Sequence, residues 1–213
     1  MIRLAAFQNP EFYKAQAMRL STYDKPRIIA CAEDHPKHIG LPRGCLDDLL
    51  QTLWGLNIKT VVRDQRNSGQ PLKATFQGEL RPEQILAAQA MLAQDTGVLA
   101  ATTAFGKTVV AAWLIAKRAV NTLVLVHRRQ LQQQWIERLS SFLGMPVRVI
   151  GRIGGGRNKP TGLLDVGVTQ SLVRNGVVDD LVGNYGHLIV DECHHLSAQS
   201  FEQVARQAKA KFV

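Results

Sequence analysis

Short apolar runs recur through residues 73–213, and stretches with helical spacing of apolar residues separate them. The runs lie at residues 97–100, 122–126, 147–150, 165–168 and 187–190. Because these runs are nearly unbroken, we expect strands that are buried on both faces, as in a parallel sheet. Helices are expected at residues 82–94, 107–120, 128–143, 170–174 and 197–209. The alternation predicts an α/β domain, in which helices cover both faces of a mostly parallel sheet.

The first 72 residues follow a different pattern. Asn9-Pro10 is typical of a helix start, because Pro is favoured at the first helical position, and it predicts a helix over residues 10–20. Strands are expected at residues 27–32, 38–42 and 58–63, and a helix is expected where Leu46, Leu49, Leu50 and Leu53 share one face. We therefore expect a small α+β module over residues 1–72. The polar, turn-rich residues 64–75 are expected to link it to a domain over residues 73–213.

The chain is basic, with 26 Lys and Arg against 17 Asp and Glu and a net charge of +9 over 213 residues. Such a surface favours a polyanionic partner, because side chains that neutralise phosphates release counterions. A protein that is simply basic and soluble is an equal alternative on charge alone. Cys31, Cys45 and Cys193 are far apart and odd in number, which favours free thiols over disulfides or zinc. Without a membrane-length apolar run or a secretion signal, we expect a cytoplasmic protein with no membrane partner.

The segment Ala101-Thr-Thr-Ala-Phe-Gly-Lys-Thr108 stands between an apolar run and an expected helix. A phosphate-binding loop needs backbone N–H groups, a helix N-terminus and a Lys for the outer phosphates. Gly106, Lys107 and Thr108 supply the end of this pattern, with Lys107 on the β- and γ-phosphates and Thr108 on Mg²⁺. Ala101 stands where the strict pattern has its first Gly. The alternative is a helix start that contains Gly-Lys-Thr by chance.

A second segment, Asp191-Glu192-Cys193-His194, follows the apolar run at residues 187–190. The carboxyl end of a strand is where open α/β sheets place their ligands. We expect Asp191 to hold Mg²⁺ and Glu192 to orient and deprotonate an attacking water. The alternative is a solvated acidic turn, which the phosphate-loop pattern upstream disfavours.

Together these segments resemble the first RecA-like domain of a superfamily 2 helicase of the DEAD/DEAH-box kind. The loop of that superfamily commonly reads A-x-T-G-x-G-K-T, which Ala101, Thr103, Gly106, Lys107 and Thr108 match, whereas Ala104 departs from it. Asp-Glu-Cys-His is a variant of the box that names the family, and the chain is similar to the excision-repair and restriction-type branch. The resemblance implies ATP and Mg²⁺ as cofactors, with Thr103, Ala104 and Phe105 in the nucleotide-binding loop.

Further residue roles follow from the same resemblance. Gln84 in Leu80-Arg-Pro-Glu-Gln84 matches a Gln that reads the adenine edge. The resemblance implies nucleic-acid contacts and one coupling residue, His194, between the nucleotide and the nucleic acid. The implied nucleic-acid contacts are Arg128, Arg129, Thr169, Gln170 and Ser171. Trp135 is expected in the core.

The resemblance covers residues 76–213 and favours DNA as the partner. It implies a second RecA-like lobe downstream of Val213, so we expect Mg²⁺-nucleotide binding but little turnover from these residues alone. Residues 1–72 are expected to be a module that senses nucleic acid. Gly154-Gly155-Gly156 predicts an exposed loop and no phosphate site, because a turn and a strand follow it. The alternatives left open are a duplex DNA translocase of a restriction or defence system and a non-catalytic nucleic-acid-binding fragment.

Overall fold

A computed structural model describes residues 1–193 and 199–213, which form two compact units, Met1–Arg63 and Asp64–Val213. The division falls earlier than the boundary expected at residue 72, because the start of the expected linker packs on the second unit. The Asn67 N–H donates to the Lys209 carbonyl at 2.7 Å, and the Leu72 N–H donates to the Ala119 carbonyl at 2.8 Å. The segment that contains Asn67 and Leu72 therefore belongs to the larger unit.

The first unit consists of short helices and strands. They are a 3-10 helix (Ile2–Ala5), β1 (Ala6–Gln8), α1 (Pro10–Ala17), β2 (Ile28–Ala30), β3 (Glu33–His35), β4 (His38–Gly40), a 3-10 turn (Arg43–Cys45) and α2 (Leu46–Gly55). The pairs β1–β2 and β3–β4 are antiparallel. Asn9 caps α1, since its side-chain oxygen accepts from the Glu11 N–H at 3.0 Å. The strand expected at residues 58–63 is wrong: the segment pairs with no strand of the described residues, and Val61 is 86% exposed.

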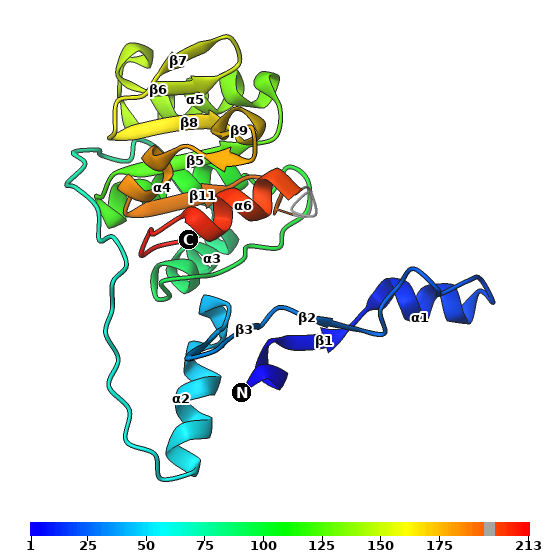
Figure 1. The fold of residues 1–213 in the computed structure, drawn as a ribbon. Coiled ribbons are helices and arrows are strands. Elements are labelled where there is room, and N and C mark those ends of the chain that lie inside the picture. Colours follow the sequence, from blue (N-terminus) through cyan, green and yellow to red (C-terminus); the bar gives the residue numbers. More distant parts are fainter. Residues whose placement is uncertain (194–198) are drawn as a thin grey trace. The chain divides into compact units, whose positions relative to one another are not determined.

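The second unit is built on a five-stranded sheet in the order β11-β5-β8-β6-β7 (Figure 1). Its strands are β5 (Thr122–Val126), β6 (Gly151–Gly154), β7 (Arg157–Lys159), β8 (Leu164–Val168) and β11 (His187–Val190). Four of them run parallel, and β7 pairs antiparallel with β6. A small hairpin of β9 (Val173–Arg174) and β10 (Val177–Val178) lies outside this sheet. The carboxyl ends of β11, β5 and β8 therefore meet at one edge.

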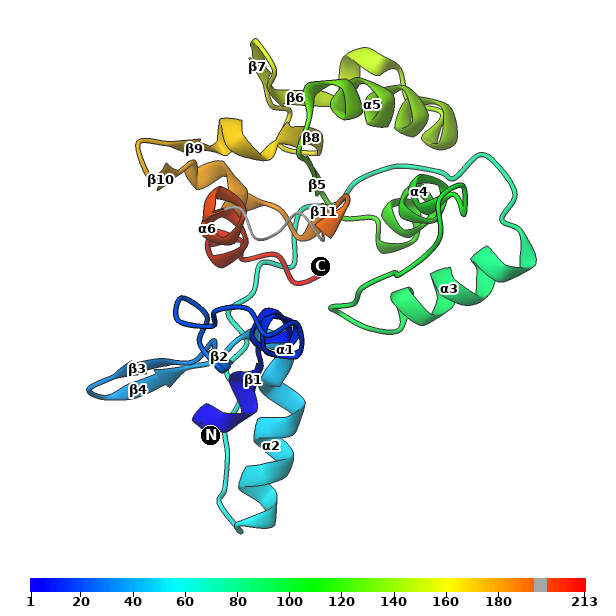
Figure 2. The ribbon, with the colours of Figure 1, turned by 90° about the vertical axis from the view of Figure 1, so that its right-hand side faces the viewer.

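Helices cover both faces of this sheet, which confirms the predicted architecture (Figure 2). The helices are α3 (Pro82–Leu92), α4 (Lys107–Arg118), α5 (Arg129–Leu143) and α6 (Gln199–Gln207). Val124 and Val126 of β5 pack with α4 and α5, whereas Leu123 and Leu125 pack with α6 and Tyr185. Successive residues of a strand point to opposite faces, so an unbroken apolar run is what a doubly covered strand requires. The helix α3 packs on α4.

Three expected elements of the second unit differ from the structure. Residues 97–100 form no strand. The Gly97 N–H donates to the Val213 carbonyl at 3.0 Å. An apolar run becomes a strand only when its backbone groups pair with a neighbouring strand. The strand expected at 147–150 begins at Gly151, preceded by a 3-10 turn (Val147–Val149). This strand position requires glycine, because a Cβ on Gly151 would lie 1.7 Å from an Asp165 carboxylate oxygen.

The expected helix at residues 170–174 is a short 3-10 helix (Thr169–Leu172), and another 3-10 helix covers Asp180–Asn184. Gly155 and Gly156 form the turn between β6 and β7, so a turn and a strand lie here as predicted. Gly156 is exposed, whereas Gly154 and Gly155 are half-buried. Among the described residues, no helix is both long and apolar enough to cross a membrane.

Candidate functional site

The loop before α4 contains two residues with a left-handed backbone conformation. Gly106 adopts φ of 89°, and Ala104 adopts φ of 65° in the same left-handed region. A Cβ on Gly106 would lie 2.5 Å from the Gln84 amide nitrogen, so this position requires glycine. No side chain of the described residues caps α4, which leaves N–H groups of its first turn for an anion.

The two predicted motifs meet at the carboxyl edge of the sheet. The Lys107 ammonium lies 3.3 Å from a Glu192 carboxylate oxygen, although 85 residues separate them in the chain. Both side chains are about one-third exposed, at 35% and 33%. Solvent therefore reaches the pair, and an incoming phosphate can compete with Glu192 for the ammonium. Lys107 and Glu192 thus share one site, as expected from the sequence.

The two predicted Mg²⁺ ligands are both contacted by α5. The Trp135 indole N–H donates to a carboxylate oxygen of Asp191 at 2.7 Å. The Arg138 guanidinium lies 3.4 Å from the hydroxyl of Thr108, which is buried. A hydroxyl and a carboxylate are hard oxygen donors, which Mg²⁺ prefers, and this ion usually takes only one or two carboxylates beside substrate phosphates. The described residues contain no cluster of three or more metal-ligating acids, histidines or cysteines.

Gln84 supports the loop through its side-chain amide. Its nitrogen donates to the Phe105 carbonyl at 2.6 Å, and its oxygen accepts from the Arg81 N–H at 2.9 Å. The Arg81 guanidinium donates to the same Phe105 carbonyl at 2.6 Å. Only 4% of Gln84 is exposed. The contact of Gln84 with adenine therefore stays a prediction, while its bond to Phe105 gives it a second task.

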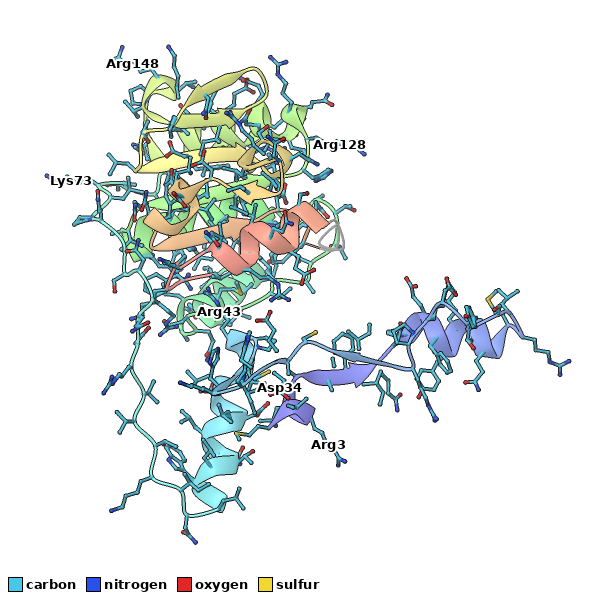
Figure 3. All side chains as sticks on the ribbon, in the orientation of Figure 1. Arg3, Asp34, Arg43, Lys73, Arg128 and Arg148 are labelled. Carbon is cyan, nitrogen blue, oxygen red and sulfur yellow. The ribbon has the colours of Figure 1, made fainter. Side chains whose placement is uncertain are left out.

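Some of the expected nucleic-acid residues are exposed to solvent, whereas Thr169 is buried and hydrogen-bonded within the protein. Arg128 and Arg129 are exposed where β5 passes into α5, and Figure 3 shows Arg128 projecting outward. Gln170 is exposed and Ser171 is half-buried. The Thr169 hydroxyl is buried and donates to the Val126 carbonyl at 3.2 Å, so it supports the strand end. Thr103 and Ala104 are exposed in the loop, and His194 lies outside the described residues.

The sequence did not reveal a polar cavity of about 230 Å³ beside Arg129. Its lining residues are Arg129, Gln132, Gln133, Arg152, Gly154 and Gly155. Gln132 is buried and donates to the carbonyls of Ile153 and Val166 at 3.0 and 2.7 Å. The run of three glycines marks this place in the sequence, where we expect an exposed loop, and all three adopt positive φ. The sequence also does not predict the contacts of Trp135 with Asp191 and of Arg138 with Thr108. A buried indole N–H usually has a partner, which was the available signal for Trp135.

Known proteins resemble this chain in sequence and in fold. A family model described as "Type III restriction enzyme, res subunit" matches residues 77–213. A relative from Acanthamoeba polyphaga mimivirus that carries the name of an ATP-dependent RNA helicase is 31% identical over 144 residues, covering 65% of this chain and 27% of its own. The DNA 3'-5' translocase XPB2 of Sulfurisphaera tokodaii is 31% identical over 128 residues, covering 60% of this chain and 28% of its own. The chain thus spans about a quarter of the length of these relatives.

A solved structure shares the fold. The UvsW helicase from bacteriophage T4 superposes with a TM-score of 0.68 at 16% sequence identity, covering 99% of this chain and 81% of that one. At this identity the likeness shows the fold alone. It agrees with the mostly parallel sheet and its covering helices.

Proposed function

We infer the function of this chain from its family: it belongs to the type III restriction enzyme res-subunit family and contains the N-terminal, RecA-like portion of a superfamily 2 helicase. The proposed function is that of the ATP- and Mg²⁺-binding lobe of a nucleic-acid helicase or translocase. The observation that carries this proposal is the 3.3 Å contact between Lys107 and Glu192 at the carboxyl edge of the sheet. It supports the proposal because phosphate-loop and acidic motifs must meet to share a bound triphosphate.

Each site residue has a defined task in this proposal. The Lys107 ammonium leaves the Glu192 carboxylate and binds the outer phosphates, and the first-turn N–H groups of α4 bind the phosphate oxygens. Thr108 and Asp191 would hold Mg²⁺, which would neutralise charge on the phosphates. Glu192, released from Lys107, orients the attacking water and accepts its proton. Gln84 holds the Phe105 carbonyl of the loop through its side-chain amide nitrogen.

Nucleic acid is the proposed partner, with DNA favoured. Arg128 and Arg129 are exposed at the same edge as the nucleotide site, and Gln170 lies beyond the end of the neighbouring strand β8. Their place allows contact with the phosphate backbone, which gives affinity and positions a strand without reading its sequence. The translocase name of one relative favours DNA, whereas the RNA helicase name of another keeps RNA as an outcome to test.

A thermal-shift scan with Mg²⁺-ADP tests the nucleotide site. We expect ADP to raise the unfolding temperature of the wild type, because a ligand that binds only the native state stabilises it. Lys107→Ala removes a hydrogen bond to a charged group and should weaken ADP binding about 10- to 100-fold. Lys117→Ala is the matched control, since Lys117 lies at the far end of the same helix, over the Trp113 ring. If ADP does not stabilise the wild type, the proposal is wrong.

Duplex translocation is the second candidate function, supported by the translocase name of one relative and by the restriction-enzyme family. Binding of single-stranded and double-stranded DNA, measured over a range of salt concentrations, compares it with strand unwinding. A preference for duplex favours translocation. Affinity that does not fall with salt would exclude the proposed phosphate contacts in either case.

A further inference from the structure

The helix α5 contacts both proposed Mg²⁺ ligands while it begins at the proposed nucleic-acid contact. Arg128 precedes its first residue, Trp135 follows two turns later, and Arg138 lies one turn beyond Trp135. At a rise of 1.5 Å per residue, the indole stands only about 10 Å along the axis from Arg128. The helix therefore joins the proposed nucleic-acid contact to the residues that touch Asp191 and Thr108.

Trp135 is held firmly by the core of the second unit. Only 5% of it is exposed, and it packs in the cluster that contains Ala112, Ile115 and Val124. An indole has one N–H and no acceptor, so this group can only donate. Its partner is a carboxylate oxygen of Asp191, at 2.7 Å. A rigid, buried donor thus fixes the orientation of a carboxylate that is itself only half-buried.

The contact differs from ordinary core packing. Asp191 continues the pairing of β11 with β5, because its N–H donates to the Leu125 carbonyl at 2.9 Å. Its backbone is therefore fixed by the sheet, and its side chain by α5. One carboxylate oxygen receives the indole N–H, and no described residue donates to the other. Groups that hold a metal ligand in this way typically change metal affinity 10- to 100-fold when they are removed.

We propose that Trp135 is a positioning residue for Asp191: its indole N–H orients the carboxylate for Mg²⁺, and α5 connects this metal ligand to the nucleic-acid contact at Arg128. The inference rests on the proposed function, which assigns Asp191 to the metal. It adds a residue that bonds to the metal ligand and a route by which a bound strand acts on the metal site. Trp135 acts through Asp191 and touches neither the nucleotide nor the metal.

Trp135→Phe tests the hydrogen bond while it keeps an aromatic ring in the core. ADP affinity is measured by calorimetry over a series of Mg²⁺ concentrations and again in EDTA. We expect the Mg²⁺ concentration for half-maximal binding to rise about 10-fold, while ADP affinity in EDTA is unchanged. Trp113→Phe is the matched control, since Trp113 lies on α4 with the Lys117 ammonium over its ring. This change should leave both values unchanged. A variant that merely loosened the fold would weaken ADP binding in EDTA as well.

A second measurement leaves Trp135 in place. The chain has three tryptophans, so Trp54→Phe with Trp113→Phe leaves Trp135 as the sole indole. We expect its emission to change when Mg²⁺ is added with ADP, and not when ADP is added in EDTA. We also expect a single-stranded oligothymidine to change the emission, because α5 joins Arg128 to the indole. Arg128→Ala should remove the response to the oligonucleotide only.

The outcomes separate this inference from the proposed function. If the wild type does not bind Mg²⁺-ADP, both are wrong. If the wild type binds but Trp135→Phe shows the same Mg²⁺ dependence, the positioning role alone is wrong. An indole emission that responds to Mg²⁺-ADP and ignores the oligonucleotide would overturn the connection through α5.

Discussion

The two ends of the same parallel sheet carry polar side chains in opposite states. At the amino ends of the strands, Asp165 is fully buried and accepts hydrogen bonds from the N–H and hydroxyl of Thr161, the Gly162 N–H and the Tyr185 hydroxyl. Asn121 is 1% exposed; its amide donates to the carbonyls of Gly162 and Asn184, both at 2.9 Å. At the carboxyl ends, Lys107 and Glu192 remain one-third exposed, and Arg128 is exposed.

This difference indicates which end is built for structure and which for ligands. Buried polar groups are tolerated when the protein satisfies their hydrogen bonds, and this condition is met by Asp165 and Asn121. A ligand site needs groups that water or a phosphate can still reach. Burial together with the hydrogen bond of Asp165 raises the pKa of Tyr185 far above its ordinary range, so this hydroxyl stays a donor. Gln84 is an exception at the carboxyl end, since it is buried and bonded like the structural residues.

The largest expected effect is at the closed end. Asp165→Ala leaves the N–H groups of Thr161 and Gly162 and the Tyr185 hydroxyl without their acceptor. Each unsatisfied donor costs about 1–3 kcal/mol, so we expect a loss of about 3 kcal/mol or more in the free energy of unfolding. Urea unfolding measures it, with Asp180→Ala on the surface as the control, expected within about 0.5 kcal/mol of the wild type. A loss no larger than that of the control would break the comparison.

A pH effect of intermediate size is expected from His187, the first residue of β11. Burial, reinforced by the nearby Arg118, lowers the pKa of His187 to about 3. In the unfolded chain the His187 ring therefore becomes protonated near pH 6.5, whereas in the native state it becomes protonated only near pH 3. The free energy of unfolding is therefore unaffected by this group above pH 6.5 and decreases as the pH falls towards 3. At pH 5 the decrease is about 2 kcal/mol.

His187→Gln should flatten this dependence, because the amide does not titrate. Unfolding free energies at pH 7.5 and pH 5 measure the effect, and His38→Gln in the first unit is the control, since His38 is exposed. An equal loss of stability in His187→Gln and in the wild type would show that other groups carry the acid sensitivity.

The smallest effect compares two arginines at opposite ends of the sheet. Arg128 follows β5 at the carboxyl end, whereas Arg148 precedes β6 at the amino end, and Figure 3 shows both projecting outward. If Arg128 contacts one phosphate, Arg128→Ala should reduce the salt dependence of single-stranded DNA binding by about 0.7 in the logarithmic slope. Arg148→Ala makes the same change in charge and should leave the slope unaltered. Fluorescence anisotropy of a labelled oligonucleotide measures both, and equal slopes would mean that only net charge matters.

By itself, the sequence determined the elements whose pattern is local. The unbroken run Thr122–Val126 is β5 as predicted, and Gly106-Lys107-Thr108 stands at the start of α4. The meeting of Lys107 with Glu192 was predicted from strands at 97–100 and 187–190, because residues that follow parallel strands reach one edge. The second strand is β11, whereas residues 97–100 form no strand. These features depend on periodicity and strand direction, which a sequence displays directly.

The tertiary structure alone decided which strands found partners and where side chains pointed. Residues 97–100 have the apolar run of a strand without its ladder, and Gly151, which looks like a turn residue, lies in the sheet against Asp165. The bond from Trp135 to Asp191 joins residues 56 positions apart. Such contacts depend on how α5 packs across the sheet, and packing of distant segments sets orientations that no local pattern records.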